Sequence, residues 1–359
     1  MIKVVHIVSG TNDVANGMAV VARLLAKEQG DAEVVDLKDS LRTLRPAGSC
    51  DRFAARPSAS ANLTTSSQAH LASALNTPSE VWVHGMWLPK EWLACWRALR
   101  AGKRLVRMTH GSLSPLYLKC QSPFKKWLVG PIERWCLRRC SKIVATCEAE
   151  KEWIEKYLGK RCPEIDVTDI KRFFELSRVD GLTQRRRGAE YAEDDGKLPS
   201  ADGGLHLLYL GRRHPLKGVE YLEKAVAELN SNPVNPVNPV QNSSTRSTCS
   251  TRLKIVSSAF GEELEKVWNW CDMLVLPTLS DNFGLVIAEA LERGKRVITT
   301  DGAPAWGDGL AGLTGFTGLY SGYEGRLIYL KGYRDGTPQE RVRLLKCAIA
   351  SLVSGLTSK

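Results

Sequence analysis

The chain has 359 residues, of which 43% are hydrophobic, and its formal net charge at pH 7 is +11. This length and apolar content support two domains with buried cores and exclude a disordered chain. No segment approaches the roughly 20 apolar residues that cross a bilayer, and the N-terminal residues predict a buried strand rather than a signal peptide. We therefore expect a cytoplasmic protein whose positive charge faces a membrane surface or an anionic substrate.

The ten cysteines stand singly and form no C-x-x-C pair. Cys136 and Cys140 are four residues apart, a spacing that suits packing along a helix as well as metal ligation. Free thiols buried in a reducing compartment explain this pattern best. We therefore expect neither a disulfide framework nor a metal site.

Short apolar segments alternate with amphipathic ones through the first 170 residues. Strands are predicted at 4–8, 33–36, 81–84, 104–109 and 143–146. Helices are predicted at 18–28, in the tryptophan-rich stretch after His84, and from Pro131 onward. The last helix would carry an apolar face of Ile132, Trp135, Cys136 and Cys140. A polar stretch at 47–67 is predicted to be a loop, and the alternation indicates a parallel sheet covered on both faces.

A second region of alternating strands and helices follows a polar, charged stretch. It begins at Leu205, and its clearest elements are a strand from Met273 and a helix over 285–293. A low-complexity stretch, in which Asn-Pro-Val occurs three times, predicts a disordered surface insert. The predicted organisation is an N-terminal domain at 1–176, a linker at 177–204, a C-terminal domain at 205–335 with its insert at 230–252, and a C-terminal helix at 336–359.

The segment from Pro277 to Leu291 is the strongest candidate site. A buried strand ends at Pro277 and a helix begins near Gly284, so backbone amides and the positive helix end would face the edge of the sheet, where they can bind a phosphate. Glu289 lies on that helix, where a carboxylate can bind sugar or ribose hydroxyls. The alternative is an ordinary strand-loop-helix in which Asp281 is a cap and Glu289 is solvated.

A second candidate segment runs from Gly211 to Gly218. Here a strand ends at glycine and a loop with several cations follows, in which Arg212 and Lys217 can bind a diphosphate from two sides. The alternative is a basic surface loop without a ligand. Two such loops in one half of the chain, each at the end of a strand, favour a shared anion site.

These two segments resemble the GT-B glycosyltransferases of family 4. Asp281 and Glu289, eight residues apart, are similar to the E-x7-E motif of that family, and Arg212 with Lys217 is similar to its arginine–lysine pair. The resemblance implies two Rossmann-like α/β domains whose parallel sheets face each other across a cleft. It also implies that the donor diphosphate is bound by Arg212, Lys217, Phe283, Gly284 and Leu285.

The resemblance extends into the first half of the chain. Gly17 lies in the expected first glycine loop, and the dipeptides that begin with His84 and His110 are similar to the histidine-glycine loops of cell-surface polysaccharide transferases. It implies that His110 faces the transferred sugar and that Gly17 and His84 belong to the acceptor side. In the second half, Asp281 would contact the donor sugar and Glu289 the ribose.

The implied reaction moves a hexose or heptose from a nucleotide-diphosphate donor to a lipopolysaccharide, capsule or similar glycan or lipid-linked acceptor. Enzymes of the family retain the anomeric configuration and use neither a metal nor another cofactor. Two departures from the family pattern stand out. Asp281 is one methylene shorter than the usual glutamate. Only one strand, at 253–256, is indicated between the Lys217 loop and the strand from Met273, where the family normally has an additional strand and helix that help to frame the nucleotide base. The nucleotide base is therefore not predicted.

The basic, aromatic segment at 119–142 admits three interpretations. The family resemblance favours a membrane surface, because lipid-linked acceptors sit at an anionic leaflet. Trp127 and Trp135 can anchor at headgroups, although Trp135 is expected rather in the core. The protein would then be peripheral on the inner face of the cytoplasmic membrane. Nucleic acid is not expected, because no nucleic-acid motif accompanies the charge; a solvated helix is the third interpretation.

Two other functional classes compete with sugar transfer. Nucleotide-linked oxidoreduction predicts G-x-G-x-x-G after the first strand, and the spacing of Gly10 and Gly17 does not fit it. A non-catalytic glycan- or nucleotide-binding protein with a shortened second sheet is the alternative that the residues leave open.

Overall fold

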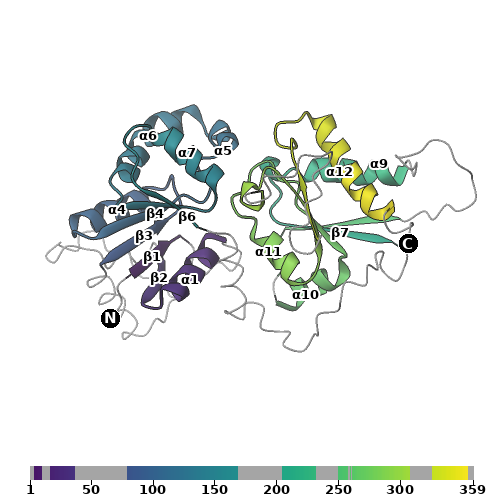
Figure 1. Ribbon diagram of the computed structural model, residues 1–359, viewed down its shortest axis with the longest axis horizontal. Coiled ribbons are helices and arrows are strands. Elements are labelled where there is room, and N and C mark those ends of the chain that lie inside the picture. The colour runs from purple at the N-terminus through teal and green to yellow at the C-terminus, as the bar shows by residue number, and fades with distance from the viewer. Residues whose placement is uncertain are drawn as a thin grey trace, which may run out of the picture. The chain divides into compact units, whose positions relative to one another are not determined.

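The computed structural model describes residues 4–9, 17–36, 79–168, 204–231, 250–257, 259, 261–307 and 326–354. The chain divides into two compact units, Met1–Thr183 and Gln184–Lys359, and each unit is built on one sheet (Figure 1). The predicted loop at 47–67, and the predicted linker apart from residue 204, lie outside the described residues.

The described part of the N-terminal unit contains a six-stranded parallel sheet in the order β2-β1-β3-β4-β5-β6. Apolar residues fill most of these strands, as is expected of a parallel sheet buried on both faces. The strands are β1 (Val4–Val8), β2 (Ala32–Asp36), β3 (Glu80–His84), β4 (Arg104–Met108), β5 (Lys142–Ala145) and β6 (Ile165–Val167). The first five confirm the predicted strands.

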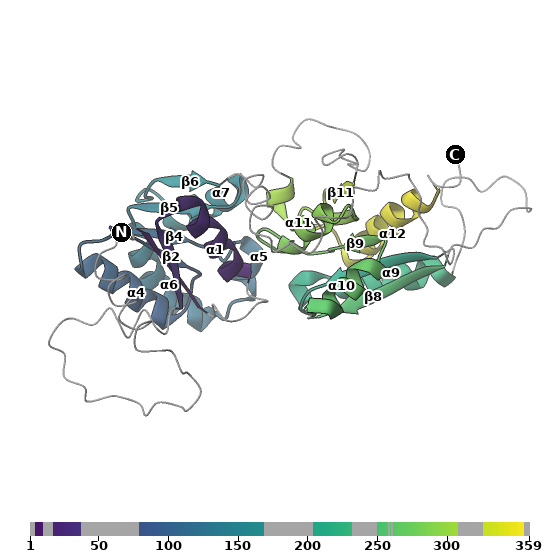
Figure 2. The same ribbon diagram turned by 90° about the horizontal axis from the view of Figure 1, so that it is seen from below.

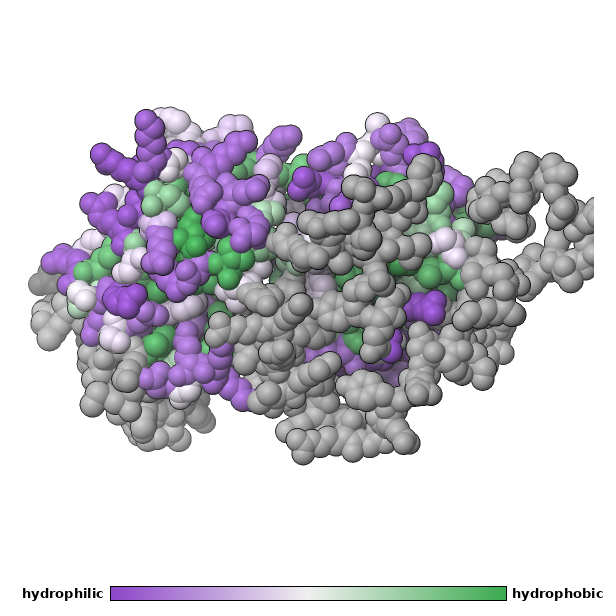
Figure 3. All heavy atoms as spheres, in the orientation of Figure 1, coloured by the Kyte–Doolittle hydropathy of each residue, from purple (hydrophilic) through white to green (hydrophobic). Residues whose placement is uncertain are grey.

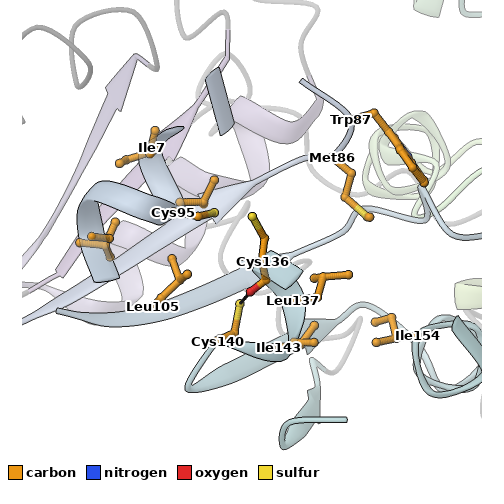
Figure 4. Packing of buried hydrophobic residues seen from close by; sticks show 14 of the residues in the cluster. Ile7, Met86, Trp87, Cys95, Leu105, Cys136, Leu137, Cys140, Ile143 and Ile154 are labelled. Carbon is orange, nitrogen blue, oxygen red and sulfur yellow. Dashed lines mark hydrogen bonds between the residues drawn. The ribbon is translucent and has the colours of Figure 1, made fainter. Parts of the chain in front are cut away.

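Helices cover both faces of this sheet, because right-handed crossovers on either side of β1 place them on opposite faces. In Figure 1, α1 lies on one face, and α4 and α6 lie on the other. The helices are α1 (Gly17–Gln29), α4 (Pro89–Arg100), α5 (Pro115–Cys120), α6 (Pro123–Arg138) and α7 (Glu148–Leu158). Side chains from β1, β3, β4, β5, α4, α6 and α7 form one apolar core (Figure 4).

Helix α6 differs from the prediction at its start and in its buried face. It begins at Pro123, and Pro131 lies inside it. Ile132 and Trp135 are 39% and 37% exposed, whereas Cys136 is buried in the core. The predicted apolar face was therefore wrong for Ile132 and Trp135, because the helix turns a buried acid, Glu133, toward the sheet instead.

The two cysteines in this region are packing residues. Cys140 follows the end of α6, and its thiol donates to the carbonyl oxygen of Cys136 at 3.3 Å (Figure 4). Both side chains belong to the core cluster. Five of the described cysteines are buried, whereas Cys120 and Cys347 are exposed, so burial was wrong as a prediction for those two.

The described part of the C-terminal unit contains a five-stranded parallel sheet in the order β11-β10-β9-β7-β8. The strand order reverses between β7 and β9. These two strands are neighbours in the sheet, and the connections that follow them cross on opposite faces. The strands are β7 (Leu205–Leu210), β8 (Thr251–Val256), β9 (Met273–Val275), β10 (Arg296–Thr300) and β11 (Leu327–Leu330).

The helices of this unit follow from the same crossover rule. In Figure 1, α9 and α12 lie on one face of the sheet, and α10 and α11 lie on the other. Figure 2 gives the same units from below. The helices are α9 (Val219–Ser231), α10 (Gly261–Trp270), α11 (Leu285–Glu292) and α12 (Pro338–Ser354).

The C-terminal unit differs from the prediction at its insert and at helix α10, and strand β11 was not predicted either. The predicted insert at 230–252 is shorter at its ends, because α9 continues to Ser231 and β8 begins at Thr251; residues 232–249 lie outside the described part. Helix α10 was not predicted. It follows β8 and supplies the helix that the sequence left out between β8 and β9.

Candidate active site

The two predicted loops of the C-terminal unit lie side by side, after β7 and after β9. The carbonyl oxygen of Leu216, in the short turn η1 (Pro215–Lys217), accepts hydrogen bonds from the amides of Leu279 at 2.8 Å and Ser280 at 3.2 Å. The hydroxyl of Thr278 donates to the same oxygen at 3.1 Å. One carbonyl group therefore joins the two loops at the edge of the sheet where α/β proteins bind ligands.

Two glycines allow three backbone segments to approach closely here. Gly218 has φ +63°, and a Cβ atom at this position would overlap the carbonyl oxygen of Pro277. A Cβ atom at Gly302, in the loop after β10, would overlap the carbonyl oxygen of Thr278. The amide of Asp281 donates to the carbonyl of Gly302 at 2.8 Å. Larger residues at either glycine would force these loops apart.

Lys217 and Asp281, predicted for different parts of the donor, contact each other. The Nζ atom of Lys217 lies 2.5 Å from a carboxylate oxygen of Asp281, and both side chains are about three-quarters buried. Arg212 is exposed on the same loop, and its carbonyl oxygen accepts from the hydroxyl of Tyr209 at 2.9 Å. The structure therefore places an oriented ammonium group and an exposed guanidinium on one loop, the two kinds of cation that bind phosphates.

Helix α11 begins beside Asp281 with an uncapped N-terminus. Its first flanking residue, Gly284, has φ +62° and ψ +60°, and no side chain among the described residues caps the helix. Phe283 is buried; its carbonyl oxygen accepts a hydrogen bond from the indole of Trp306, and the two rings lie 5.8 Å apart. Trp306 thus fixes the loop before α11. The first amides of the helix, from Leu285 on, point out of its N-terminal end, and helix N-termini bind anions.

Glu289 lies within α11 and is largely buried. Burial raises the pKa of its carboxyl, with Arg293 acting in the opposite direction. The guanidinium of Arg293 bonds instead to the backbone carbonyl of Glu289 at 3.2 Å and to the carboxylate of Glu265 at 3.1 Å. Within the described residues the Glu289 carboxyl has no hydrogen-bond partner, so it can bind hydroxyl groups.

In the N-terminal unit, the two predicted histidines are in contact. His84 ends β3, His110 follows β4, and Nδ1 of His84 lies 2.9 Å from Nε2 of His110. A third histidine, His6 of β1, lies 2.9 Å from His84. Burial lowers the pKa of His6 and of His110 to about 4 and lowers that of His84 as well, so all three rings are neutral at pH 7. His6 was not predicted.

A buried carboxylate fixes the backbone around His110. Glu150, at the start of α7, accepts hydrogen bonds from the hydroxyl of Thr109 at 2.5 Å, the amide of Gly111 at 2.6 Å and the amide of Thr146 at 2.8 Å. His110, between the first two, has φ +50°, an uncommon conformation for a non-glycine residue. The carboxylate therefore holds the loop that positions the His110 ring.

A second buried carboxylate fixes the segment after His84. Glu133 of α6 accepts from the indole of Trp92 at 2.8 Å and from the amide of Trp87, and it forms an ion pair with Arg107 at 3.4 Å. Arg107 also donates to the carbonyl oxygen of Gly85 at 2.7 Å. Both charged side chains are fully buried. The only signal of this network in the sequence was that Glu133 is the lone acid among many cations.

Gly17 is the first residue of α1, and the loop before it lies outside the described residues. Within the described ranges, no group of three or more His, Cys, Asp or Glu side chains is placed to hold a metal ion. No helix in this part of the chain has the length and apolar character needed to span a membrane.

Comparison with known protein families assigns both halves. Residues 4–168 match a model described as "Glycosyl transferase 4-like domain", and residues 204–316 match one described as "Glycosyl transferases group 1". No curated protein sequence matches the chain.

Solved structures share the fold at low sequence identity. Sucrose-phosphate synthase from Thermosynechococcus elongatus is 14% identical with a TM-score of 0.54, over 99% of this chain and 91% of that one. An α,α-trehalose-phosphate synthase (UDP-forming) from Burkholderia xenovorans is 10% identical with a TM-score of 0.53, over 98% and 92%. Anabaena Alr3699/HepE, solved with UDP, is 14% identical with a TM-score of 0.50, over 99% and 93%.

The paired parallel-sheet units and these matches define a protein of the GT-B fold, which confirms the predicted fold class. The chain belongs to the GT-B glycosyltransferases of the group 1 type, enzymes that transfer a sugar from a nucleotide-sugar donor.

Proposed function

We propose that this glycosyltransferase moves a hexose or heptose from a nucleotide diphosphate to a lipopolysaccharide, capsule or similar glycan or lipid-linked acceptor, with retention and without a metal. The observation that carries the donor assignment is the meeting of Lys217, Asp281 and the uncapped start of α11 at one sheet edge. This arrangement supports a diphosphate site because cations converge there with the positive N-terminal end of a helix.

In the proposed reaction, the bond between the anomeric carbon and the diphosphate oxygen breaks, and the acceptor hydroxyl forms the new bond on the same face of the sugar. The hydroxyl proton passes to the departing diphosphate. Lys217, Arg212 and the amides of Gly284 and Leu285 stabilise the charge that develops on that leaving group, which is the stabilisation a metal-independent enzyme needs. Phe283, packed under Trp306, holds these amides in place.

Two carboxyl groups and one histidine are assigned to sugar recognition. Glu289 would accept hydrogen bonds from the ribose hydroxyls, because its carboxyl is available among the described residues. Asp281 would contact the donor sugar and orient Lys217. His110 would contact the transferred sugar, with Gly17 on the acceptor side of the N-terminal unit; both roles rest on the family resemblance.

The assignment is tested with a panel of UDP-, GDP- and ADP-sugars. Calorimetry identifies the base that binds, and a product assay with glycan acceptors then measures transfer. Replacing Lys217 or Glu289 by alanine should abolish transfer while the thermal unfolding transition stays near that of the wild type. Full activity in both variants would refute the assignment, and binding without product would favour a non-catalytic nucleotide- or glycan-binding protein.

A membrane surface is the second partner that we propose, through residues 119–142. Three side chains of α6 are unusually exposed for their apolar character: Phe124 (69%), Trp127 (75%) and Leu128 (50%). Exposed cations flank them, among them Lys119 and Lys126, and Figure 3 shows hydrophobic side chains between hydrophilic ones on the N-terminal unit. Each nearby cation contributes about 1 kcal/mol at an anionic membrane surface.

Side-chain exposure favours Trp127 over Trp135 as the proposed anchor. Trp135 is 37% exposed, and the guanidinium of Arg139 lies 4.5 Å from its ring centroid. Trp127 is twice as exposed, and it lies three residues after Phe124 and one before Leu128, on the same side of α6. Trp127 is therefore the proposed main anchor in the peripheral, inner-face location.

A further inference from the structure

Three histidines and one glutamine form a continuous hydrogen-bonded chain through the N-terminal unit. Nδ1 of His6 lies 2.9 Å from Nε2 of His84, and Nδ1 of His84 lies 2.9 Å from Nε2 of His110. At the far end, the side-chain oxygen of Gln29 lies 2.8 Å from Nε2 of His6. Gln29 is the last residue of α1, which covers the face of the sheet opposite α4 and α6.

The register of the sheet brings the histidine rings together. His6 pairs with Trp82, and His84 follows Trp82 by two residues, so all three side chains point to the same face. The rings of His6 and His84 lie 5.2 Å apart, and those of His84 and His110 lie 5.1 Å apart. His110 continues this row from the loop that Glu150 holds.

In such a chain, the proton position on one ring determines the next. A neutral imidazole has one N–H donor and one lone-pair acceptor. All three rings are neutral at pH 7, because burial lowers their pKa values. At each contact between two rings, the wrong tautomer would place two lone pairs or two N–H groups against each other.

The amide oxygen of Gln29 sets the direction of the chain, because it can only accept. Nε2 of His6 must then carry the proton, and Nδ1 of His6 accepts from Nε2–H of His84. Nδ1 of His84 accepts in turn from Nε2–H of His110. The chain ends at Nδ1 of His110, a lone pair without a hydrogen-bond partner among the described residues.

We propose that Gln29, His6 and His84 are positioning residues that hold His110 as its Nε2–H tautomer, so that Nδ1 of His110 accepts a hydrogen bond from a substrate hydroxyl. The role of His110 toward substrate rests on the proposed sugar transfer. The specificity follows from the lone pair: a sugar hydroxyl can donate to it, whereas a phosphate oxygen or a carbonyl presents only a second acceptor.

The proton positions are measured directly by nuclear magnetic resonance of the full chain labelled with ¹⁵N on histidine. Each of His6, His84 and His110 is assigned by the signal lost in a single histidine-to-glutamine variant. We expect a protonated Nε2 and a bare Nδ1 on His110 at neutral pH. A proton on Nδ1 of His110 would overturn the proposal, and this result does not depend on any detectable sugar transfer.

The anchoring role of glutamine is tested by Gln29→Leu, with Lys27→Gln, an exposed position on the same helix, as the matched control. Without the acceptor, His84 and His110 should populate both tautomers. If the mixture is even, half of the molecules stay competent and transfer falls about two-fold, whereas His110→Ala should lose far more. A Gln29→Leu protein with the same single His110 tautomer as the wild type would refute the relay.

Activity and proton position together separate the two proposals. If the wild type transfers no sugar but has the expected His110 tautomer, the proposed function is refuted and the proposed histidine chain is not. If the wild type transfers sugar but carries a proton on Nδ1 of His110, the histidine chain is refuted and the proposed function is not. If Gln29→Leu does not fold, Gln29→Met removes the same acceptor while conserving side-chain length, and the wild-type spectrum remains decisive for the tautomer.

Discussion

The close approach of the loops after β7 and β9 makes Gly218→Ala a direct probe of the donor site. The substitution adds two costs. Alanine at φ +63° is strained by about 1–2 kcal/mol. The new Cβ also overlaps the carbonyl oxygen of Pro277, and overpacking of this kind costs about 1–3 kcal/mol. Relief of the overlap must move η1 away from the loop that bonds to Leu216.

The matched control is Gly332→Ala. Gly332 has φ +74°, but a Cβ atom there would meet none of the described residues within 4 Å, so only the strain of about 1–2 kcal/mol remains. Urea unfolding should therefore show a larger loss for Gly218→Ala than for Gly332→Ala, by about 1–3 kcal/mol.

The same pair of variants tests function by calorimetry with the nucleotide sugar that the wild type binds. Gly218→Ala should weaken binding about ten-fold or more, because each 1.4 kcal/mol lost from the loop geometry corresponds to about a factor of ten. Gly332→Ala should bind like the wild type. Equal stability losses together with equal affinities in the two variants would refute the reasoning that these loops are held together to form the site.

Three further predictions concern the N-terminal unit. Glu133→Ala leaves the fully buried Arg107 without its ion-pair partner and should cost about 3–5 kcal/mol of unfolding free energy in urea, whereas the exposed Glu148→Ala should stay near wild type. Because burial lowers the pKa of His6 to about 4, below its unfolded value, stability should fall as pH drops from about 6.5 toward 4; unchanged urea midpoints at pH 7 and 5 would contradict this. Trp127→Ser should reduce co-sedimentation with phosphatidylglycerol vesicles more than the control Trp96→Ser on α4, and equal losses would argue against α6 as the anchor.

Much of the fold could be predicted because buried parallel strands are marked by local apolar composition. The strands at 81–84, 104–109 and 143–146 correspond to β3, β4 and β5, within one residue at each end. The prediction was wrong at the start of α6, because Pro131 is typical of a first helical residue but lies inside this helix. Helix α10 was missed because its first turns are mostly acidic and only Val267 and Trp268 are buried.

The site could be predicted only where its residues are close in sequence. The spacing of Asp281 and Glu289 around Gly284 and the cations of the Lys217 loop indicated the C-terminal site, and the structure brings the two loops into contact. A lone histidine in a strand, such as His6, carries no local signal, because its contact with His84 depends on strand register. The same holds for Glu150, whose burial beneath the His110 loop follows from the packing of α7.

Two contacts that support the donor proposal could not be predicted from the sequence. The pairing of Lys217 with Asp281 joins residues that are 64 positions apart, and no spacing rule links them. Likewise, the indole of Trp306 that holds Phe283 comes from the loop after β10. These contacts are decided by which strands lie next to each other in the sheet.

The central claim is that a diphosphate is bound by Lys217, Arg212 and the start of α11. The most direct measurement is the calorimetric affinity of UDP, GDP and ADP for the wild type and for Lys217→Met, with Arg213→Met as control. Arg213 is the neighbour of Arg212 but forms an exposed ion pair with Glu223. We predict at least ten-fold weaker binding for Lys217→Met, since a hydrogen bond to a charged group contributes about 1.5–3 kcal/mol, and wild-type binding for Arg213→Met. Equal affinities in all three proteins would contradict the claim.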